Sequence, residues 1–111
     1  MVAEYVAPYK KTNVAILALA SWTSDEIEVP YWAGGFWIDC KTTADGTLHT
    51  QKEIGGAWAT FDSLPVLAGA VTTPTRVFNF RVPVLRFIFT PALGAPATIS
   101  FDCELTAGRA D

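Results

Sequence analysis

Few side chains of this 111-residue sequence could do nucleophilic or acid–base chemistry, and only one of them is a histidine. A serine nucleophile needs a neighbouring base, so any serine hydrolase built on this chain would have to use His49. No serine lies in the Gly-x-Ser-x-Gly context of a nucleophile elbow. His49 closely follows the Asp45-Gly46 pair, where an exposed, solvated imidazole is expected. We therefore expect that the protein is not an enzyme.

Three carboxylates, those of Asp39, Asp102 and Glu104, fall on the polar side of two alternating segments. Carboxylates that converge from neighbouring strands can hold calcium or act as the acid and base of a glycosidase. Salt bridges across a sheet are the commoner use of such residues, and we expect them here. The basic partners at comparable alternate positions are Arg76, Arg81 and Arg86.

The two cysteines, Cys40 and Cys103, are too far apart in sequence for a Cys-x-x-Cys motif, and one histidine cannot complete a zinc site with them. Each falls on the apolar side of an alternating segment, which indicates two free, buried thiols, with a disulfide as the alternative. The glycine pairs 34–35 and 55–56 lack the spacing of a phosphate-binding loop. We expect no metal and no cofactor.

The composition is unusually apolar for a chain of this length. Hydrophobic residues make up 50% of it without glycine, charged residues make up 17%, and the net charge is -3; an average domain is about 25% charged. No apolar run approaches the roughly 18–20 residues that cross a membrane. The basic run is limited to Lys10-Lys11, so nucleic acid is not expected as a direct partner. We expect the apolar excess to be covered by other protein subunits.

Short runs rich in β-branched and aromatic residues, separated by glycine and proline, predict an all-β protein. Asp45-Gly46 predicts a type I′ hairpin between two of these strands, and Gly55-Gly56 predicts a second reversal. Segment 14–22 could be helix or strand, and its Val, Ile and Trp favour strand. The other expected strands are 26–32, 36–42, 47–54, 57–61, 76–82, 84–90 and 97–105, with 64–71 as an edge strand or crossover.

These segments predict an antiparallel β-sandwich, or a jelly-roll-like fold, of about eight strands. One domain is expected over residues 14–105, preceded by an extended arm over 1–13 and followed by a tail over 106–111. The aromatic residues could fill the core, contact another subunit or form a sugar-stacking platform. The residues predicted to contact other subunits are Tyr5, Pro8, Tyr9, Trp32 and Trp37.

The carboxyl-terminal two thirds resembles the small β-sandwich proteins of tailed bacteriophage particles. The segments that carry the resemblance are Asp45-Gly46, the turn 55–58, the segment 81–90 and the segment 97–105 after a Gly-Pro loop. It implies a non-enzymatic capsid decoration or cement protein that bridges major capsid subunits as a homo-oligomer, such as a trimer. Such a protein would reside in the virion and assemble in the cytoplasm of the bacterial host. The alternative is a carbohydrate-binding or host-attachment module of a virion.

Overall fold

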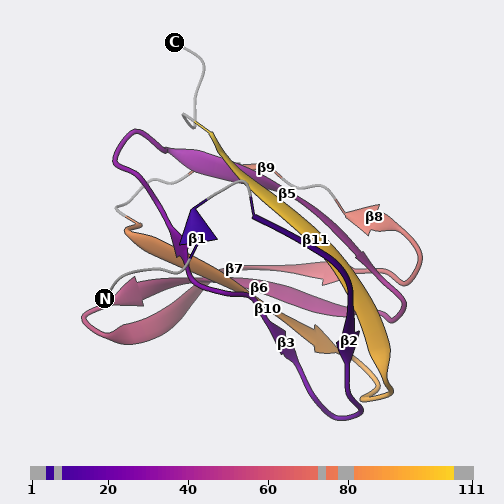
Figure 1. Ribbon diagram of the computed structural model, residues 1–111. Coiled ribbons are helices and arrows are strands. Elements are labelled where there is room, and N and C mark those ends of the chain that lie inside the picture. Colours follow the sequence, from indigo (N-terminus) through magenta and orange to yellow (C-terminus); the bar gives the residue numbers. More distant parts are fainter. Residues whose placement is uncertain (1–4, 7–8, 73–74, 78–81, 107–111) are drawn as a thin grey trace.

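Two β-sheets packed face to face form the protein (Figure 1). The computed structural model describes residues 5–6, 9–72, 75–77 and 82–106, and these contain eleven strands and no helix. The first strands are β1 (Tyr5–Val6), β2 (Tyr9–Ile16), β3 (Trp22–Thr23), β4 (Ile27–Glu28), β5 (Gly35–Thr42) and β6 (Gly46–Ile54). They are followed by β7 (Ala57–Val66), β8 (Val71–Thr72), β9 (Thr75–Val77), β10 (Val84–Pro91) and β11 (Ala97–Thr106). The predicted all-β sandwich is confirmed, with more strands than expected because several short ones pair along the sheets.

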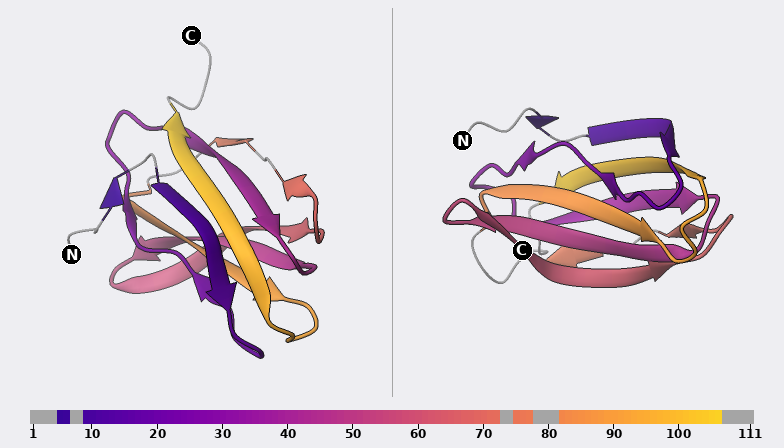
Figure 2. Two further views of the ribbon diagram at one scale, coloured as in Figure 1. Left: turned by 45° about the vertical axis from the view of Figure 1, so that its right-hand side comes forward. Right: turned by 90° about the horizontal axis from the view of Figure 1, so that it is seen from below.

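The first sheet, called sheet A, has the strand order β1-β4-β10-β6-β7, and β3 pairs with the other end of β10. The second, called sheet B, has the order β2-β11-β5-β8, with β9 also paired to β5. Neighbouring strands are antiparallel except β1 and β4. In the right-hand view of Figure 2, which looks onto the sheets, β10 and β6 of sheet A cross in front of β11 and β5 of sheet B.

Alternating side chains of β10 and β11 form the centre of the core, as the sequence predicts. The ring of Phe87 on β10 lies 4.8 Å from that of Phe101 on β11 and 5.5 Å from that of Phe36 on β5, measured between centroids. All three rings are almost fully buried. The other buried residues of these two strands are Val84, Leu85, Phe89, Pro91, Ala97, Ile99, Cys103 and Leu105.

The predicted hairpin at Asp45-Gly46 is wrong. Strand β5 belongs to sheet B and β6 to sheet A, so the connection crosses between the layers. Neither Asp45 nor Gly46 has the positive φ that a type I′ turn requires. Glycine serves another purpose here, because a Cβ at Gly46 would lie 2.4 Å from the Thr90 carbonyl oxygen and 2.6 Å from the Phe89 ring.

A tight hairpin lies at Gly55-Gly56 instead. Both glycines have positive φ, 57° and 86°, and the flanking residues Ile54 and Ala57 are paired. These are the features of a two-residue type I′ turn, and the reversal predicted at this glycine pair is confirmed. The hairpin joins β6 to β7 within sheet A.

Segment 14–22 is not one strand. Strand β2 ends at Ile16, a turn follows, and β3 begins at Trp22 in the other sheet. The predicted arm 1–13 is also too long, because residues 9–13 lie within β2, which pairs with β11. The strand consequently begins five residues before the expected start of the domain at residue 14.

Three other predicted strands are shorter than expected or are interrupted. Only Ile27–Glu28 of segment 26–32 is a strand. Segment 64–71 divides into the end of β7, a turn and the start of β8. Of segment 76–82, residues 76–77 belong to β9 and residues 78–81 lie outside the described part of the chain, as do residues 107–111 of the predicted tail.

Candidate binding surfaces

Tyr9, a predicted contact with another subunit, is a core residue. Its side chain is 3% exposed, and its ring meets that of Phe101 edge to face. The hydroxyl donates to Asp25 Oδ2 at 2.8 Å and accepts the Asp25 backbone N–H at 3.0 Å. Lys11 Nζ lies 3.4 Å from the same carboxylate. Tyr9 therefore holds β2 to the segment before β4 and is not available to a neighbouring molecule.

The other predicted contact residues are scattered. Tyr5 lies on β1, whose backbone pairs with β4, while Pro8 lies outside the described residues. Trp32 is 55% exposed in the loop between β4 and β5, next to Tyr31, which is 91% exposed. Trp37 is half-buried on β5. The two tryptophans thus remain candidates, but on different parts of the surface.

His49 is half-buried rather than freely solvated. Its Nδ1 lies 2.8 Å from Ser63 Oγ, on the outer side of sheet A. A serine and a histidine at hydrogen-bonding distance are two members of a catalytic triad. Within the described part of the chain, no acidic side chain is hydrogen-bonded to this ring. The geometry thus gives a cross-strand pair of serine and histidine.

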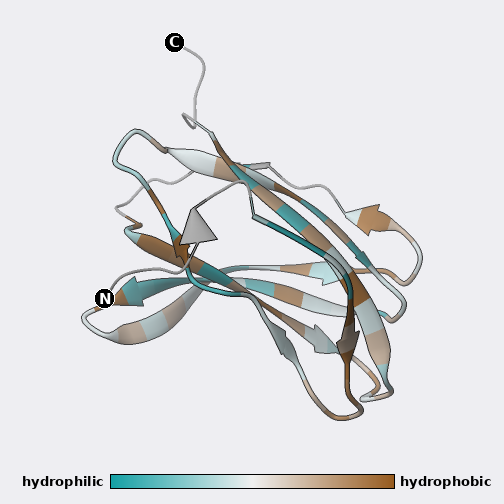
Figure 3. Ribbon diagram, viewed as in Figure 1, coloured by the Kyte–Doolittle hydropathy of each residue, from teal (hydrophilic) through white to brown (hydrophobic). Residues whose placement is uncertain are grey.

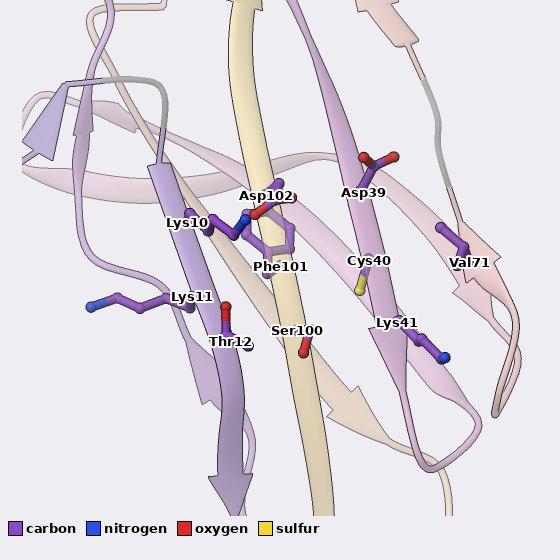
Figure 4. A pocket seen from close by; sticks show the side chains of 10 residues that line it. All are labelled: Lys10, Lys11, Thr12, Asp39, Cys40, Lys41, Val71, Ser100, Phe101 and Asp102. Carbon is purple, nitrogen blue, oxygen red and sulfur yellow. The ribbon is translucent and has the colours of Figure 1, made fainter.

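Asp39 and Asp102 lie opposite each other on β5 and β11 and border a shallow groove on sheet B (Figure 4). The groove has a volume of about 330 Å³ and is also lined by Lys10 and Lys41. Lys10 is the register partner of Asp102 on the other side of β11. Within the described residues no cluster of three or more histidines, cysteines, aspartates or glutamates could hold a metal ion.

The predicted salt bridges between these carboxylates and arginines are wrong for the two arginines that the structure describes. Arg76 Nε lies 2.6 Å from Asp62 Oδ2, which links β9 of sheet B to β7 of sheet A. Arg86 bonds to Gln51 on the outer face of sheet A. Arg81 lies outside the described residues.

Both cysteines are free, buried thiols in the core. This confirms the favoured sequence prediction rather than the alternative of a disulfide. Cys40 is opposite Phe101 in the β5–β11 register, and Cys103 is opposite Ile38, so the two cysteines do not face each other. Burial raises the pKa of each thiol to about 12, with the Glu104 charge adding to the shift at Cys103. Such thiols are inert, because the thiolate is the reactive form.

One end of the sandwich is formed by apolar loops, which we call the apolar end. It comprises loops 17–21, 43–45, 67–70 and 92–96, which lie together at the right-hand end of the right view in Figure 2. Large exposed side chains project from three of the four loops, and Asp45 is the only charged residue in them. Their exposures are Leu17 75%, Leu19 91%, Leu67 63% and Leu93 91%. Figure 3 shows the hydrophobic colouring at the end of β2, just before the first of these loops.

Hydrogen bonds tie the four loops together. Leu19 N–H donates to the Gly94 carbonyl at 2.7 Å, and Ala92 N–H donates to the Asp45 carbonyl at 2.9 Å. The Asp45 carboxylate in turn accepts the backbone N–H of Ala68 at 2.7 Å. Each of the four loops also carries the chain from one sheet to the other. The exposed leucines therefore project from a cross-linked frame rather than from independent loops.

Leu19 adopts a backbone conformation that is costly for its residue type. Its φ is 63°, in the left-handed region that L-residues with large side chains rarely occupy. Gly94, also at positive φ, leaves room for it, because a Cβ at Gly94 would lie 2.8 Å from Leu19 Cδ2. A strained backbone that holds an apolar side chain in water is a signal of function.

A groove of about 320 Å³ opens beside Leu93 at the apolar end. Its walls are mostly apolar and come from the loops after β5, β7 and β10. They include Ala44, Ala68, Pro91, Leu93 and Ala95. The groove is wide enough for an apolar side chain of a partner protein.

No protein-family model matches the sequence, and no curated protein matches it. Solved structures do share the fold. Over 93% of the chain it is similar to the PBSX exported protein XepA, with a TM-score of 0.70 and 17% identity; the match covers 38% of XepA. PirA has a TM-score of 0.61 at 13% identity, with 85% of this chain and 91% of PirA covered. A family 6 carbohydrate-binding module has a TM-score of 0.51 at 13% identity, with 96% of this chain and 100% of the module covered.

These likenesses show the fold. The chain spans well under half the length of XepA. A β-sandwich of this kind therefore occurs in the PBSX exported protein XepA and in a family 6 carbohydrate-binding module.

Proposed function

We propose that the protein is a non-enzymatic structural protein of a phage particle that docks onto other particle subunits through its apolar end. In its most specific form it is a capsid decoration protein that bridges major capsid subunits as a homo-oligomer, such as a trimer, and resides in the virion. The observation that carries the proposal is the set of exposed leucines on a cross-linked, nearly uncharged frame. The likeness to XepA supports the phage context.

Burial of the leucines supplies the free energy of docking. Covering one leucine side chain is worth about 1.5–3 kcal/mol, and a micromolar complex needs about 8 kcal/mol. Several leucines docked together reach this range, provided that little is lost in ordering them. The hydrogen bonds between the loops reduce that loss. A protein that binds only the assembled lattice stabilises that lattice by mass action.

The proposal is tested by binding to particles assembled without this protein. The double variant Leu19→Asp with Leu93→Asp should lower the bound amount by about tenfold or more, because it places charge in an apolar interface. Ile54→Asp is the matched control, since Ile54 is 54% exposed but lies in the hairpin between β6 and β7, away from the apolar end. Equal loading of the double variant and the control would contradict docking through this end. Failure of the wild-type protein to load would contradict the particle role itself.

A second candidate function is glycan binding or host attachment. It is favoured by the neighbouring aromatic residues Tyr31 and Trp32, which are 91% and 55% exposed in one loop, and by the likeness to a carbohydrate-binding module. Glycan-array binding that Trp32→Ala abolishes would support it. Trp37→Ala serves as the comparison, because that ring is half-buried on a different surface. Binding that both variants retain would exclude this loop as the glycan site.

A further inference from the structure

The outer face of sheet A holds an arginine in a fixed position. Arg86 on β10 donates from Nε to Gln51 Oε1 on β6 at 2.7 Å. Its guanidinium carbon lies 4.3 Å from the ring centroid of Trp58 on β7, which is the geometry of a cation–π stack. Two contacts from two strands thus hold a group that is usually flexible.

The hydrogen bonds across this face run in one direction. Because Arg86 can only donate, Gln51 must accept through Oε1, and its Nε2 faces the next strand. Nε2 donates to Thr60 Oγ1 at 2.9 Å. The Thr60 hydroxyl therefore accepts a hydrogen bond from Gln51, and its own proton can be donated to a ligand. The row Arg86–Gln51–Thr60 presents donors to a ligand.

The guanidinium lacks a counter-ion among the residues that the structure describes. No carboxylate there lies within 4.0 Å of Arg86 nitrogens, whereas Arg76, its counterpart on sheet B, is paired with Asp62. Glu53 shares the face but is the register partner of Trp58. Among the described residues only Nε of Arg86 forms a hydrogen bond, so the two terminal nitrogens can form the paired donor fork that recognises a carboxylate.

Two more polar side chains continue the face. The next row across the same three strands is Ile88, His49 and Ser63, and the last two are hydrogen-bonded to each other. The hydrogen-bonding groups of His49 and Ser63 stand next to the charge, so they can meet a ligand that carries hydroxyls beside its carboxylate. A peptide strand is a poorer match, because it binds by adding to a sheet edge and β6 lies between β10 and β7.

We propose that the outer face of sheet A binds acidic sugars. Arg86 receives the carboxylate through its terminal nitrogens, while Thr60 donates to a ring or hydroxyl oxygen. The His49–Ser63 pair meets a further hydroxyl of the same or the next sugar. This site is separate from the apolar end and from the Tyr31–Trp32 loop, and it depends on neither proposed function.

The test uses the full-length protein and three oligosaccharide probes that carry a carboxylate, built from galacturonate, glucuronate or sialate. Binding is measured by calorimetry and by the change in NMR signals, with the Trp58 indole N–H as the local reporter. At least one probe should bind in the millimolar range or tighter and shift the Trp58 signal. Its methyl ester should bind about tenfold more weakly or worse, because the ester cannot accept the charged fork.

Variants locate the site. Arg86→Gln should weaken binding of the acidic probe by about tenfold or more, and Thr60→Val should weaken it less. The matched control is Lys41→Gln, which removes one positive charge from sheet B and should leave binding unchanged. If Arg86→Gln fails to fold, Thr60→Val and the ester comparison still decide the question. The proposal is overturned by binding of none of the probes, by equal binding of acid and ester, or by signal changes confined to the Tyr31–Trp32 loop.

Discussion

At the scale of single residues, Leu19 allows the effect of backbone strain on stability to be measured separately from the effect of its side chain on docking. A left-handed conformation costs a residue with a Cβ about 1–2 kcal/mol, while glycine adopts it freely but loses about 0.5–1 kcal/mol of chain entropy. Leu19→Gly should therefore change the free energy of unfolding by less than about 1 kcal/mol. The same variant should lose loading onto particles, because the side chain that docks is gone.

Urea unfolding together with particle loading checks this prediction. A marked destabilisation would mean that the Leu19 side chain supports the fold despite its exposure. Retained loading would mean that Leu19 is not an anchor. Leu19→Asn, which also tolerates the left-handed region, is a further variant that keeps the backbone and removes the apolar side chain.

The two thiols give a second prediction at this scale. Burial raises the pKa of Cys40 and Cys103 from 9.0 to about 12. At pH 8 the thiolate fraction is then lower by about a thousandfold than for an exposed cysteine, so a thiol reagent should label the native protein very slowly. Labelling should become fast in denaturant. Rapid labelling of the native protein at pH 8 would show that a thiol reaches solvent.

The same shift sets a pH dependence. The folded state keeps both thiols protonated above pH 9, where the unfolded chain releases its protons. The contribution of the two protonated thiols to the free energy of unfolding is thus complete below about pH 9 and is lost as pH rises toward 12. Replacing the cysteines with alanine should flatten the decline of unfolding free energy over this window.

At the scale of elements, period-two alternation was enough to locate the central strands. Segments 84–90 and 97–105 agree with β10 and β11 to within one residue at each end, because burial on one face is encoded locally. Alternation does not say which strand pairs with which. Segments 36–42 and 47–54 were correctly predicted as strands but wrongly joined as a hairpin, because Asp-Gly favours a turn type only when the flanking strands pair.

Short strands were harder to predict, because side chains take the place of some backbone hydrogen bonds between strands. Ser24 separates β3 from β4, and its hydroxyl accepts the Phe87 backbone N–H at 2.8 Å and donates to the Asp25 carbonyl. This lets two two-residue strands share β10 with a break between them. The local sequence pattern of segment 22–28 does not indicate that a serine hydroxyl takes the place of a backbone hydrogen bond there.

Two glycines test the difference between close approach and conformational freedom. Gly46→Ala should destabilise the protein by about 3 kcal/mol or more, because its Cβ would meet the Thr90 carbonyl and the Phe89 ring. Gly55→Ala meets open space and should cost about 1–2 kcal/mol for its positive φ alone. Gly55→Asn should recover part of that loss, whereas Gly46→Asn should not. Thermal unfolding of the four variants measures these differences, and equal effects at both sites would contradict the assignment.

At the scale of the whole molecule, the excess of apolar residues has two destinations. Most lie between the sheets, but Leu17, Leu19, Leu67 and Leu93 do not. The composition predicted that some apolar surface would remain outside the core. It could not predict where on the fold this surface lies, because the sequence does not distinguish a leucine in a loop from one in a core. The Arg86–Trp58 stack was also missed, because it joins β10 to β7 across β6 and depends on register.

The exposed end leads to a prediction about the isolated protein. Without its partner, the apolar end has only other copies of the chain to cover it. Light scattering after size-exclusion chromatography should therefore show a mass above that of one chain at high concentration. The double variant Leu19→Asp with Leu93→Asp should reduce that mass, and the Ile54→Asp control should not. A wild-type protein that stays monomeric at every concentration would argue against the homo-oligomer, while leaving its loading onto particles to be measured separately.

Every loop of the apolar end is also a connection between the two sheets. A molecule bound at that end would contact connections to both sheets. Its binding would therefore stabilise the packing of the two sheets far from the contact itself. Amide hydrogens in the middle of β5 and β6 should then exchange more slowly in the occupied state, because separation of the layers must precede their exposure. Attachment and resistance to opening would in this way be one property of the chain.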